Sequence, residues 1–187
     1  TSPTATSTAA EKSKPVRWDQ TEMPWRMVAF SPPAGYWVYS ATGSQSFQLV
    51  PGKTPAPSYA DPREGAMTER VAEFYAVDRD PISFPTWDRF EITMAQFACA
   101  SGDTDATFVT CSDKTANVVR GQTAAGLPYA KFTLPSYRKK DKAFMGNHTY
   151  FVVRLGQGSD NAIMLAVLNE KTGVTPAWGL VKSMKMK

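Results

Sequence analysis

The sequence predicts an α+β fold, in which an antiparallel β-sheet carries one central amphipathic helix and a short C-terminal helix packed on it, as an α/β sandwich. Three observations predict this class. β-Rich runs lie on both sides of one stretch with helical periodicity, Gly-, Pro-, Asn- and Asp-containing turns separate the later runs, and a helix-forming segment ends the chain. Strands and helices segregated in this order are typical of α+β domains.

The 187 residues are 42% hydrophobic and 20% charged, which is ordinary for a folded domain. We expect residues 1–17 to be a flexible tether rich in Ser, Thr, Ala and Pro, because such a segment buries too little apolar area to offset its ordering entropy. Residues 18–187 are then a single α+β domain. A tether of this kind is expected between a periplasmic domain and a membrane anchor or cleaved leader, and a plain disordered end is the alternative.

Aromatic and β-branched runs predict the first strands. Residues 24–30 and 35–41 are expected to be strands separated by the turn sequence SPPA, and residues 46–52 a third, closed by Pro51 and Gly52. Residues 53–65 form a Pro-rich loop of a length that is usually functional or mobile. Residues 67–81 alternate from Val71 onward and predict a strand, with a helix as the alternative because Ala, Glu and Arg favour helices.

The central helix is indicated by apolar residues that recur along one helical stripe, namely Trp87, Phe90, Met94, Phe97 and Ala98. Thr86 is placed to cap the N-terminus of this helix, and Asp88 puts a negative charge in its first turn. Gly102 is expected to end it.

Five β-rich runs follow, at residues 106–111, 115–126, 128–137, 148–158 and 161–173. Residues 124–128 and 156–161 are expected to be hairpin connections. Residues 162–168 are apolar on both faces, which predicts a central strand, and they are too few to span a bilayer. Pro176 is expected to open a short C-terminal helix, in which Trp178, Val181 and Met184 point inward.

The two cysteines, Cys99 and Cys111, are expected to form a disulfide. Their spacing of twelve matches neither a C-x-x-C redox motif nor a zinc half-site, and the single histidine excludes a Cys/His metal cage. Two buried free thiols are the alternative. A loop of this size contributes about 3 kcal/mol on the chain-entropy model. A disulfide implies an oxidising compartment, and we therefore expect a periplasmic or extracellular location with the leader removed.

No motif assigns a catalytic residue, a metal ligand or a cofactor, so the chain is more consistent with a binding protein than with an enzyme. His148 would need a nucleophile and an orienting carboxylate nearby in space. The candidate serines, Ser136, Ser159 and Ser183, do not lie in a nucleophile elbow. Residues 78–81 and 102–107 carry acids without the spacing of a calcium loop, and turn or capping roles are favoured for them.

A binding surface is predicted from two groups of residues. The first is aromatic and the second basic: Tyr36, Trp37, Tyr39 and Tyr59, and Arg138, Lys139, Lys140 and Lys142. Alternation along a strand puts Trp37 and Tyr39 on the face opposite Tyr36, so one aromatic set is expected to face outward, with core packing as the alternative.

The net charge of +4 is distributed unevenly. Residues 1–112 carry 9 Lys and Arg against 13 Asp and Glu, whereas residues 113–187 carry 12 against 4. This asymmetry is compatible with an acidic partner such as an acidic protein, anionic lipid or nucleic acid, but basic residues scattered over solvated strand faces are the favoured interpretation.

The order of elements resembles the PsbP-like fold, a family that includes an extrinsic protein of photosystem II and related bacterial lipoproteins. The likeness lies in residues 30–40, in the helix at residues 83–97, in the glycine turn before residues 127–132, and in the closing segments at residues 149–155, 162–169 and 176–186. The resemblance implies a small α/β sandwich used as a non-enzymatic accessory module, and it assigns no functional residue.

We therefore expect a non-catalytic exported accessory or binding protein, with a lipid-anchored periplasmic protein as one form of it. Its expected partner is another envelope or extracellular protein, with a peptide or glycan as further options. Nucleic acid is disfavoured, and a membrane contact is expected only through an N-terminal lipid anchor. The alternatives are a small hydrolase-type enzyme with a site of dispersed Asp, Glu, Ser and Tyr, and a basic surface that binds anionic lipid or nucleic acid.

Overall fold

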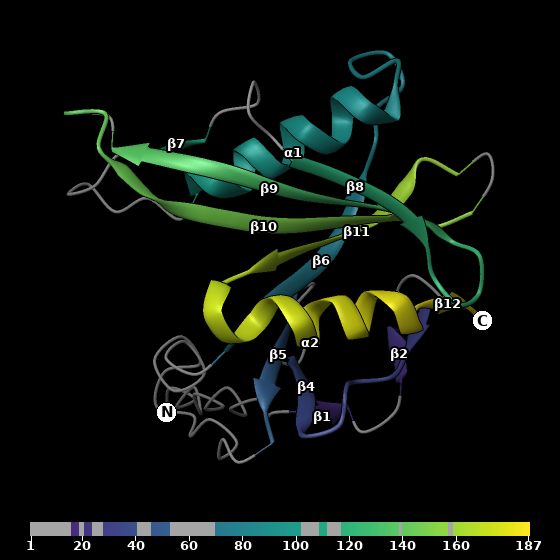
Figure 1. Cartoon of the computed structure of the whole chain (residues 1–187). Coiled ribbons are helices and arrows are strands. Elements are labelled where there is room, and N and C mark those ends of the chain that lie inside the picture. Colours follow the sequence, from purple (N-terminus) through teal and green to yellow (C-terminus); the bar gives the residue numbers. More distant parts are fainter. Residues whose placement is uncertain are drawn as a thin grey trace, which may run out of the picture.

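The structure, a computed structural model, describes residues 16–18, 21–23, 28–40, 46–52, 70–101, 109–111, 117–138, 140–156 and 159–187. Over these residues the chain forms an antiparallel nine-stranded sheet, a second sheet of three strands and two helices. The fold is α+β, as the sequence predicts (Figure 1).

The large sheet has the strand order β1-β4-β5-β6-β11-β10-β9-β7, and β8 also pairs with β9. Its strands are β1 (Val16–Trp18), β4 (Tyr36–Ser40), β5 (Ser46–Pro51), β6 (Ala72–Asp78), β7 (Val109–Cys111), β8 (Asn117–Gln122), β9 (Pro128–Arg138), β10 (Phe144–Arg154) and β11 (Asn161–Val167). The small sheet has the order β12-β3-β2, with β2 (Thr21–Met23), β3 (Val28–Phe30) and β12 (Lys185–Met186).

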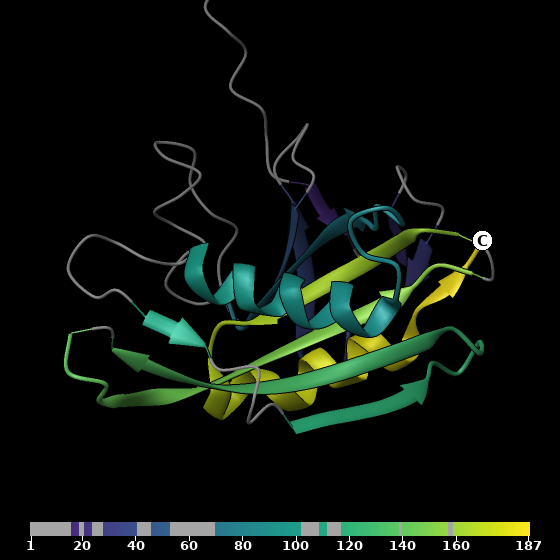
Figure 2. The same cartoon turned by 90° about the horizontal axis from the view of Figure 1, so that it is seen from above.

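The two helices cover opposite faces of the large sheet, as Figures 1 and 2 show. Helix α1 (Trp87–Ser101) packs on β7, β9 and β10, and helix α2 (Glu170–Ser183) packs on β10, β11 and β3. Strands between two helical layers are buried on both faces. In β10, Phe151 and Val153 join the core under α2, whereas Tyr150 and Val152 join the core under α1.

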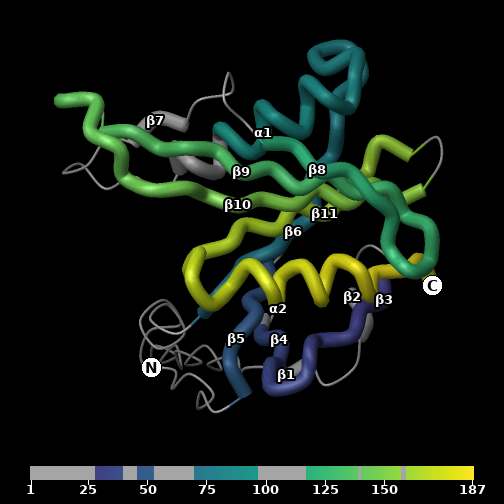
Figure 3. The backbone as a smooth tube through the Cα atoms, viewed as in Figure 1, coloured from purple at the N-terminus to yellow at the C-terminus, as the bar shows by residue number. Residues whose placement is uncertain are grey.

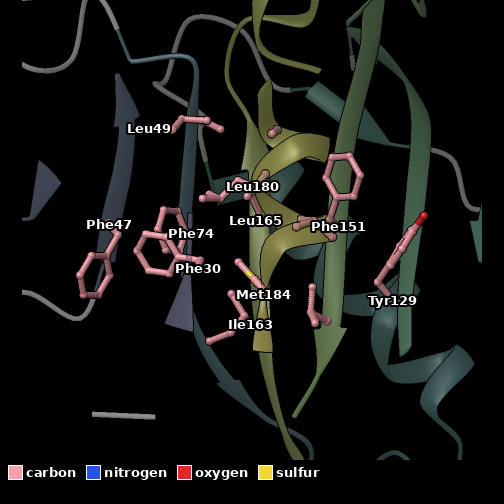
Figure 4. Packing of buried hydrophobic residues seen from close by; sticks show 14 of the residues in the cluster. Phe30, Phe47, Leu49, Phe74, Tyr129, Phe151, Ile163, Leu165, Leu180 and Met184 are labelled. Atoms are coloured by element: carbon pink, nitrogen blue, oxygen red, sulfur yellow. The ribbon is translucent and has the colours of Figure 1, made fainter. Parts of the chain in front are cut away.

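Strand β11 confirms the prediction of a central strand at residues 162–168 except at its last residue, since the strand ends at Val167 and Leu168 is 44% exposed. Ile163 and Leu165 lie on the α2 face and Ala162 and Met164 on the α1 face, and all four are fully buried or nearly so. Figure 4 shows how the α2 face is filled: Phe30, Phe74 and Leu180, from β3, β6 and α2, converge on the side chains of β11.

Helix α1 begins as predicted. The Thr86 hydroxyl accepts a hydrogen bond from the Arg89 N–H at 3.4 Å, and Asp88 lies in the first turn. Phe90 is buried and makes edge contacts with the rings of Phe84 and Trp87. The side chains of Phe97 and Ala98, and Gly102 with its predicted capping role, lie outside the described residues.

Helix α2 begins earlier than the sequence analysis expected. The prediction placed its first residue at Pro176, but the helix runs from Glu170 and Pro176 lies inside it. The cap is Asn169, whose side chain accepts hydrogen bonds from the N–H groups of Lys171 and Thr172. The predicted inward-facing residues are confirmed for Val181 and Met184, which are fully buried.

The N-terminal strands are divided between the two sheets. The SPPA turn is present, with the Tyr36 N–H bonded to the Pro33 carbonyl at 3.0 Å and Gly35 at a φ of +82°, but β3 and β4 do not pair with each other. Strand β3 instead pairs with β2 on one side and with β12 on the other, so the C-terminal end lies beside β3 (Figure 3). The strand at residues 67–81 is confirmed as β6.

The predicted tether at residues 1–17 and the loop at residues 53–65 fall mainly outside the described residues. Val16 and Arg17, which the prediction gave to the tether, are the first two residues of β1 and pair with Ser40 and Tyr39.

Candidate functional site

The predicted basic loop forms the tip of the long hairpin made by β9 and β10. Figure 1 shows this tip at the far end of the sheet from the turn between β8 and β9. We use "hairpin tip" for Tyr137, Arg138, Lys140, Asp141, Lys142, Phe144 and Met145. Two large apolar side chains are exposed there, Phe144 by 60% and Met145 by 43%, and the Phe144 ring lies edge-on to Tyr137 at 5.9 Å.

The backbone of the hairpin tip is held by local hydrogen bonds. The Asp141 carboxylate accepts from the Ala143 N–H at 3.1 Å and pairs with the Arg138 guanidinium at 3.1 Å. Lys142 adopts a φ of +59°, a left-handed conformation that is uncommon outside glycine. A register shift between Phe144 and Gly146 marks a bulge, and bulges re-aim the side chains next to them. Arg138, Lys140 and Lys142 outnumber Asp141, so the described part of the tip is basic.

The aromatic part of the predicted surface needs a correction. Trp37 and Tyr39 are only 3% and 2% exposed, and they form a separate buried cluster with Val50. Val38, on the opposite face of β4, is fully buried in the main core, so the three central side chains of β4 are not available to a partner. Tyr36 is partly buried against the same core. Tyr59 and Lys139 lie outside the described residues.

The structure brings His148 to Ser136, which the sequence analysis did not anticipate. His148 Nε2 lies 3.0 Å from Ser136 Oγ. The Ser136 hydroxyl is also within hydrogen-bonding distance of the Gly146 carbonyl oxygen, at 3.1 Å. Ser136 is fully buried, and burial lowers the pKa of His148, although Glu170 opposes this shift. The Glu170 carboxylate binds Thr149 through its N–H and its hydroxyl. A fully buried hydroxyl is out of reach of a substrate, as is typical of a structural group.

A cavity of about 590 Å³ lies at the other end of the sheet, between the start of α1, the β8–β9 turn and the β10–β11 connection. Its polar walls are Arg79, Gln122, Arg154, Ser159 and Asp160, and its apolar wall includes Trp87. No local sequence pattern predicts this site, because its residues come from five separate segments.

The two arginines of the cavity are held in place by carboxylates and by one indole. Arg79 binds Asp160 Oδ1 through Nε at 2.9 Å and the Phe84 carbonyl through Nη1 at 2.7 Å. Arg154 Nε binds Glu91 Oε1 at 2.9 Å. Both guanidinium carbons lie 5.0 Å from the centre of the Trp87 ring, within range of a cation–π contact.

Glu91, in α1, is fully buried although its side chain is a carboxylate. Its second oxygen accepts from Arg120 Nη1 at 2.9 Å. Asp88, which is 75% exposed, also pairs with Arg120 at 2.8 Å and with Arg154 at 3.8 Å. The cluster of Arg79, Arg120, Arg154, Asp88, Glu91 and Asp160 therefore contains equal numbers of cations and anions.

Cys99 lies in α1 and Cys111 in β7, and these two elements pack against each other. The side chains of both cysteines lie outside the described residues, so the disulfide stays a prediction. Among the described residues no three His, Cys, Asp or Glu side chains gather as a set of metal ligands. Over the same residues no helix has both the length and the apolar character needed to cross a bilayer.

Comparison with solved structures confirms the predicted fold. The solution structure of cyanobacterial PsbP from Synechocystis sp. PCC 6803 superposes with a TM-score of 0.50 over 100% of both chains, at 9% sequence identity. At that identity the likeness shows the fold, which is PsbP-like. No protein-family model matches the sequence. No curated protein matches it either.

Proposed function

We propose that the chain is a non-catalytic accessory protein, active outside the cytosol, that docks on an acidic partner protein through the hairpin tip. The single observation that carries this proposal is the pair of exposed apolar side chains, Phe144 and Met145, beside the basic residues Arg138, Lys140 and Lys142. Apolar anchors ringed by charge are the usual composition of a docking site.

The small number of uncompensated lysines and the exposed Phe144 ring favour a protein partner over a lipid surface. Arg138 is already paired with Asp141, which leaves Lys140 and Lys142 as the uncompensated cations of the described tip. Attraction to an anionic leaflet contributes about 1 kcal/mol for each basic residue, so two lysines would hold the chain at a membrane only weakly. An apolar pocket on a protein would in addition bury Phe144 completely.

The accessory role is supported by the PsbP-like fold, since the family that the sequence resembles is used as a non-enzymatic module. Export is supported by the composition of residues 1–17 and by the predicted disulfide. The buried Ser136–His148 pair gives no support to the hydrolase alternative, because its hydroxyl is closed to substrate.

Site-specific photo-crosslinking in cells of the source organism tests the docking site. A benzophenone amino acid at Phe144 should give a discrete crosslinked protein, and the same group at Ile82, which is 92% exposed and lies in the β6–α1 connection, should not. The double substitution Lys140→Glu and Lys142→Glu should abolish the adduct at Phe144 if the partner is acidic.

Equal adducts at positions 144 and 82, or none at 144, would contradict docking through the tip. Flotation with phosphatidylglycerol vesicles provides the lipid comparison. If the chain floats with these vesicles and the double lysine substitution releases it, the tip binds membrane and the protein-docking proposal is wrong.

A further inference from the structure

The cavity beside Trp87 has the size and position of a ligand site that is independent of the hairpin tip. Its volume of about 590 Å³ falls within the range of about 300–1,000 Å³ for small-molecule pockets. It lies at the end of the sheet where β6, β10 and β11 meet the start of α1, whereas the hairpin tip lies at the opposite end of β9 and β10.

The polar groups of the cavity are fixed before any ligand arrives. Asp160 holds Arg79 through two of its guanidinium nitrogens, and Glu91 holds Arg154. The side chains of Arg79 and Arg154 are only 14% and 25% exposed. Because these groups are already ordered, a ligand that binds them loses little additional side-chain entropy.

The balance of charge indicates what kind of ligand this site takes. Arg79 is paired with Asp160, Arg154 with Glu91, and Arg120 with both Glu91 and Asp88. An anion therefore meets two guanidinium groups whose charge is already neutralised, and a cation meets a carboxylate that is already bound. Neither gains the net attraction that an unpaired arginine or aspartate would supply.

A neutral polyhydroxylated ligand matches the groups that remain. Gln122 and Ser159 each carry both a donor and an acceptor, Arg154 carries donors and Asp160 an acceptor, and a sugar hydroxyl can serve either kind of group. The C–H groups of a sugar ring suit the apolar walls formed by Trp87, Leu127 and Pro128.

We propose that this cavity is a binding site for a neutral saccharide, held by hydrogen bonds to Arg154, Asp160, Gln122 and Ser159 and by apolar contact with Trp87. The site is separate from the docking surface, so loss of one leaves the other intact.

Nuclear magnetic resonance titration of the full chain tests this site. The probes are maltotriose, cellotriose and triacetylchitotriose as neutral saccharides, sodium sulfate as an anion and triglycine as a zwitterion. The readout is the indole N–H signal of Trp87, assigned by its loss in Trp87→Phe, together with the amides of Gly126 and Gly156. At least one saccharide should shift these signals saturably at concentrations up to about 10 mM, and sulfate and triglycine should not.

Two exposed residues of β8 provide the variant and its control. Gln122→Ala removes a hydrogen-bonding wall residue and should raise the saccharide Kd about threefold to tenfold, while Asn117→Ala, at the other end of the strand, should leave it unchanged. The proposal is overturned if no saccharide shifts the signals, if sulfate or triglycine shifts them and the saccharides do not, or if the two variants bind alike.

Discussion

At the scale of single residues, Glu91 is a charged group that the fold has taken out of water. Its carboxylate is fully buried and is shared by Arg120 and Arg154, each at 2.9 Å. Burying a carboxylate is unfavourable unless hydrogen bonds and opposite charges compensate it, and here both are present. The same contacts hold Arg154 at the wall of the cavity.

Glu91→Ala is expected to lower the free energy of unfolding by about 3 kcal/mol, because it leaves two guanidinium groups beside a vacated, buried position. Asp88→Ala is the matched control, since Asp88 pairs with the same two arginines but is 75% exposed, and it should cost about 1 kcal/mol or less. Urea unfolding of both variants measures the difference. Equal losses would contradict a special role for the buried carboxylate.

The signal for Glu91 was present in the sequence. It follows Trp87 by four residues and precedes Met94 by three, so helical spacing places it on the predicted apolar stripe. Its compensating arginines, Arg120 and Arg154, lie on strands far along the chain, and no local pattern connects them to α1. The burial of the carboxylate could be suspected from spacing, but its partners could not be named.

His148 is expected to make stability depend on pH. Burial lowers its pKa in the folded chain below the ordinary value near 6.5, so in the acid range the unfolded chain binds more protons than the folded one. Stability from this source is complete above about pH 6.5 and falls as the pH drops toward the folded-state pKa.

His148→Gln should therefore lose less stability than the native chain when the pH is lowered from about 7.5 to about 5.5, as measured by urea unfolding at both values. His148 is the only histidine in the chain, so no other imidazole titrates in this range. The carboxylates are the same in both proteins and contribute similarly to the two losses. An identical loss in the two proteins would show that His148 titrates normally in the fold.

At the scale of elements, the start of α2 is set by its N-cap residue, Asn169, and not by Pro176. Pro176 suggested a first residue, because proline favours the start of a helix. In the fold Asn169 caps two N–H groups, and Gly173, one turn later, packs against the backbone of Val71, the residue that precedes β6. A proline inside a helix removes one N–H donor, and the burial of Ala177 and Leu180 in the α2-side core compensates that loss.

Gly173→Ala is expected to destabilise the chain, although a change from Gly to Ala within a helix usually raises the free energy of unfolding by about 1 kcal/mol. A Cβ at Gly173 would lie 2.5 Å from the Val71 carbonyl oxygen, a backbone atom that cannot move freely. Crowding of this kind typically costs about 1–3 kcal/mol. Gly179→Ala is the control, because its nearest contact is the Pro33 side chain at 3.2 Å. Thermal unfolding should rank Gly173→Ala clearly below Gly179→Ala.

At the scale of the whole molecule, the sequence pattern predicted the order of helices and strands along the chain better than it predicted which strands pair in the sheets. The apolar run in β11 and the stripe of α1 identified the centre of the sheet and one of its covering helices. The pairing of β3 with β12 could not be predicted, because it joins residues near the two ends of the chain. The cavity was missed for the same reason: Arg79, Gln122 and Arg154 meet only after the sheet has formed.

The predicted disulfide links the stability of the whole molecule to the compartment in which it folds. Helix α1 carries Cys99, strand β7 carries Cys111, and the two elements pack together. A disulfide between these residues would therefore join two elements that are already in contact and close the loop between them. Reduction of the oxidised chain should then lower the free energy of unfolding by about 3 kcal/mol, because the unfolded state regains the entropy of the open loop.

Urea unfolding with and without a reducing agent measures this difference, and the double substitution Cys99→Ser and Cys111→Ser should be as unstable as the reduced chain and insensitive to the agent. Alkylation of the unreduced, denatured protein followed by mass spectrometry should find both thiols blocked. If both react, the chain is stable without a covalent link, and only the composition of residues 1–17 then supports an oxidising compartment.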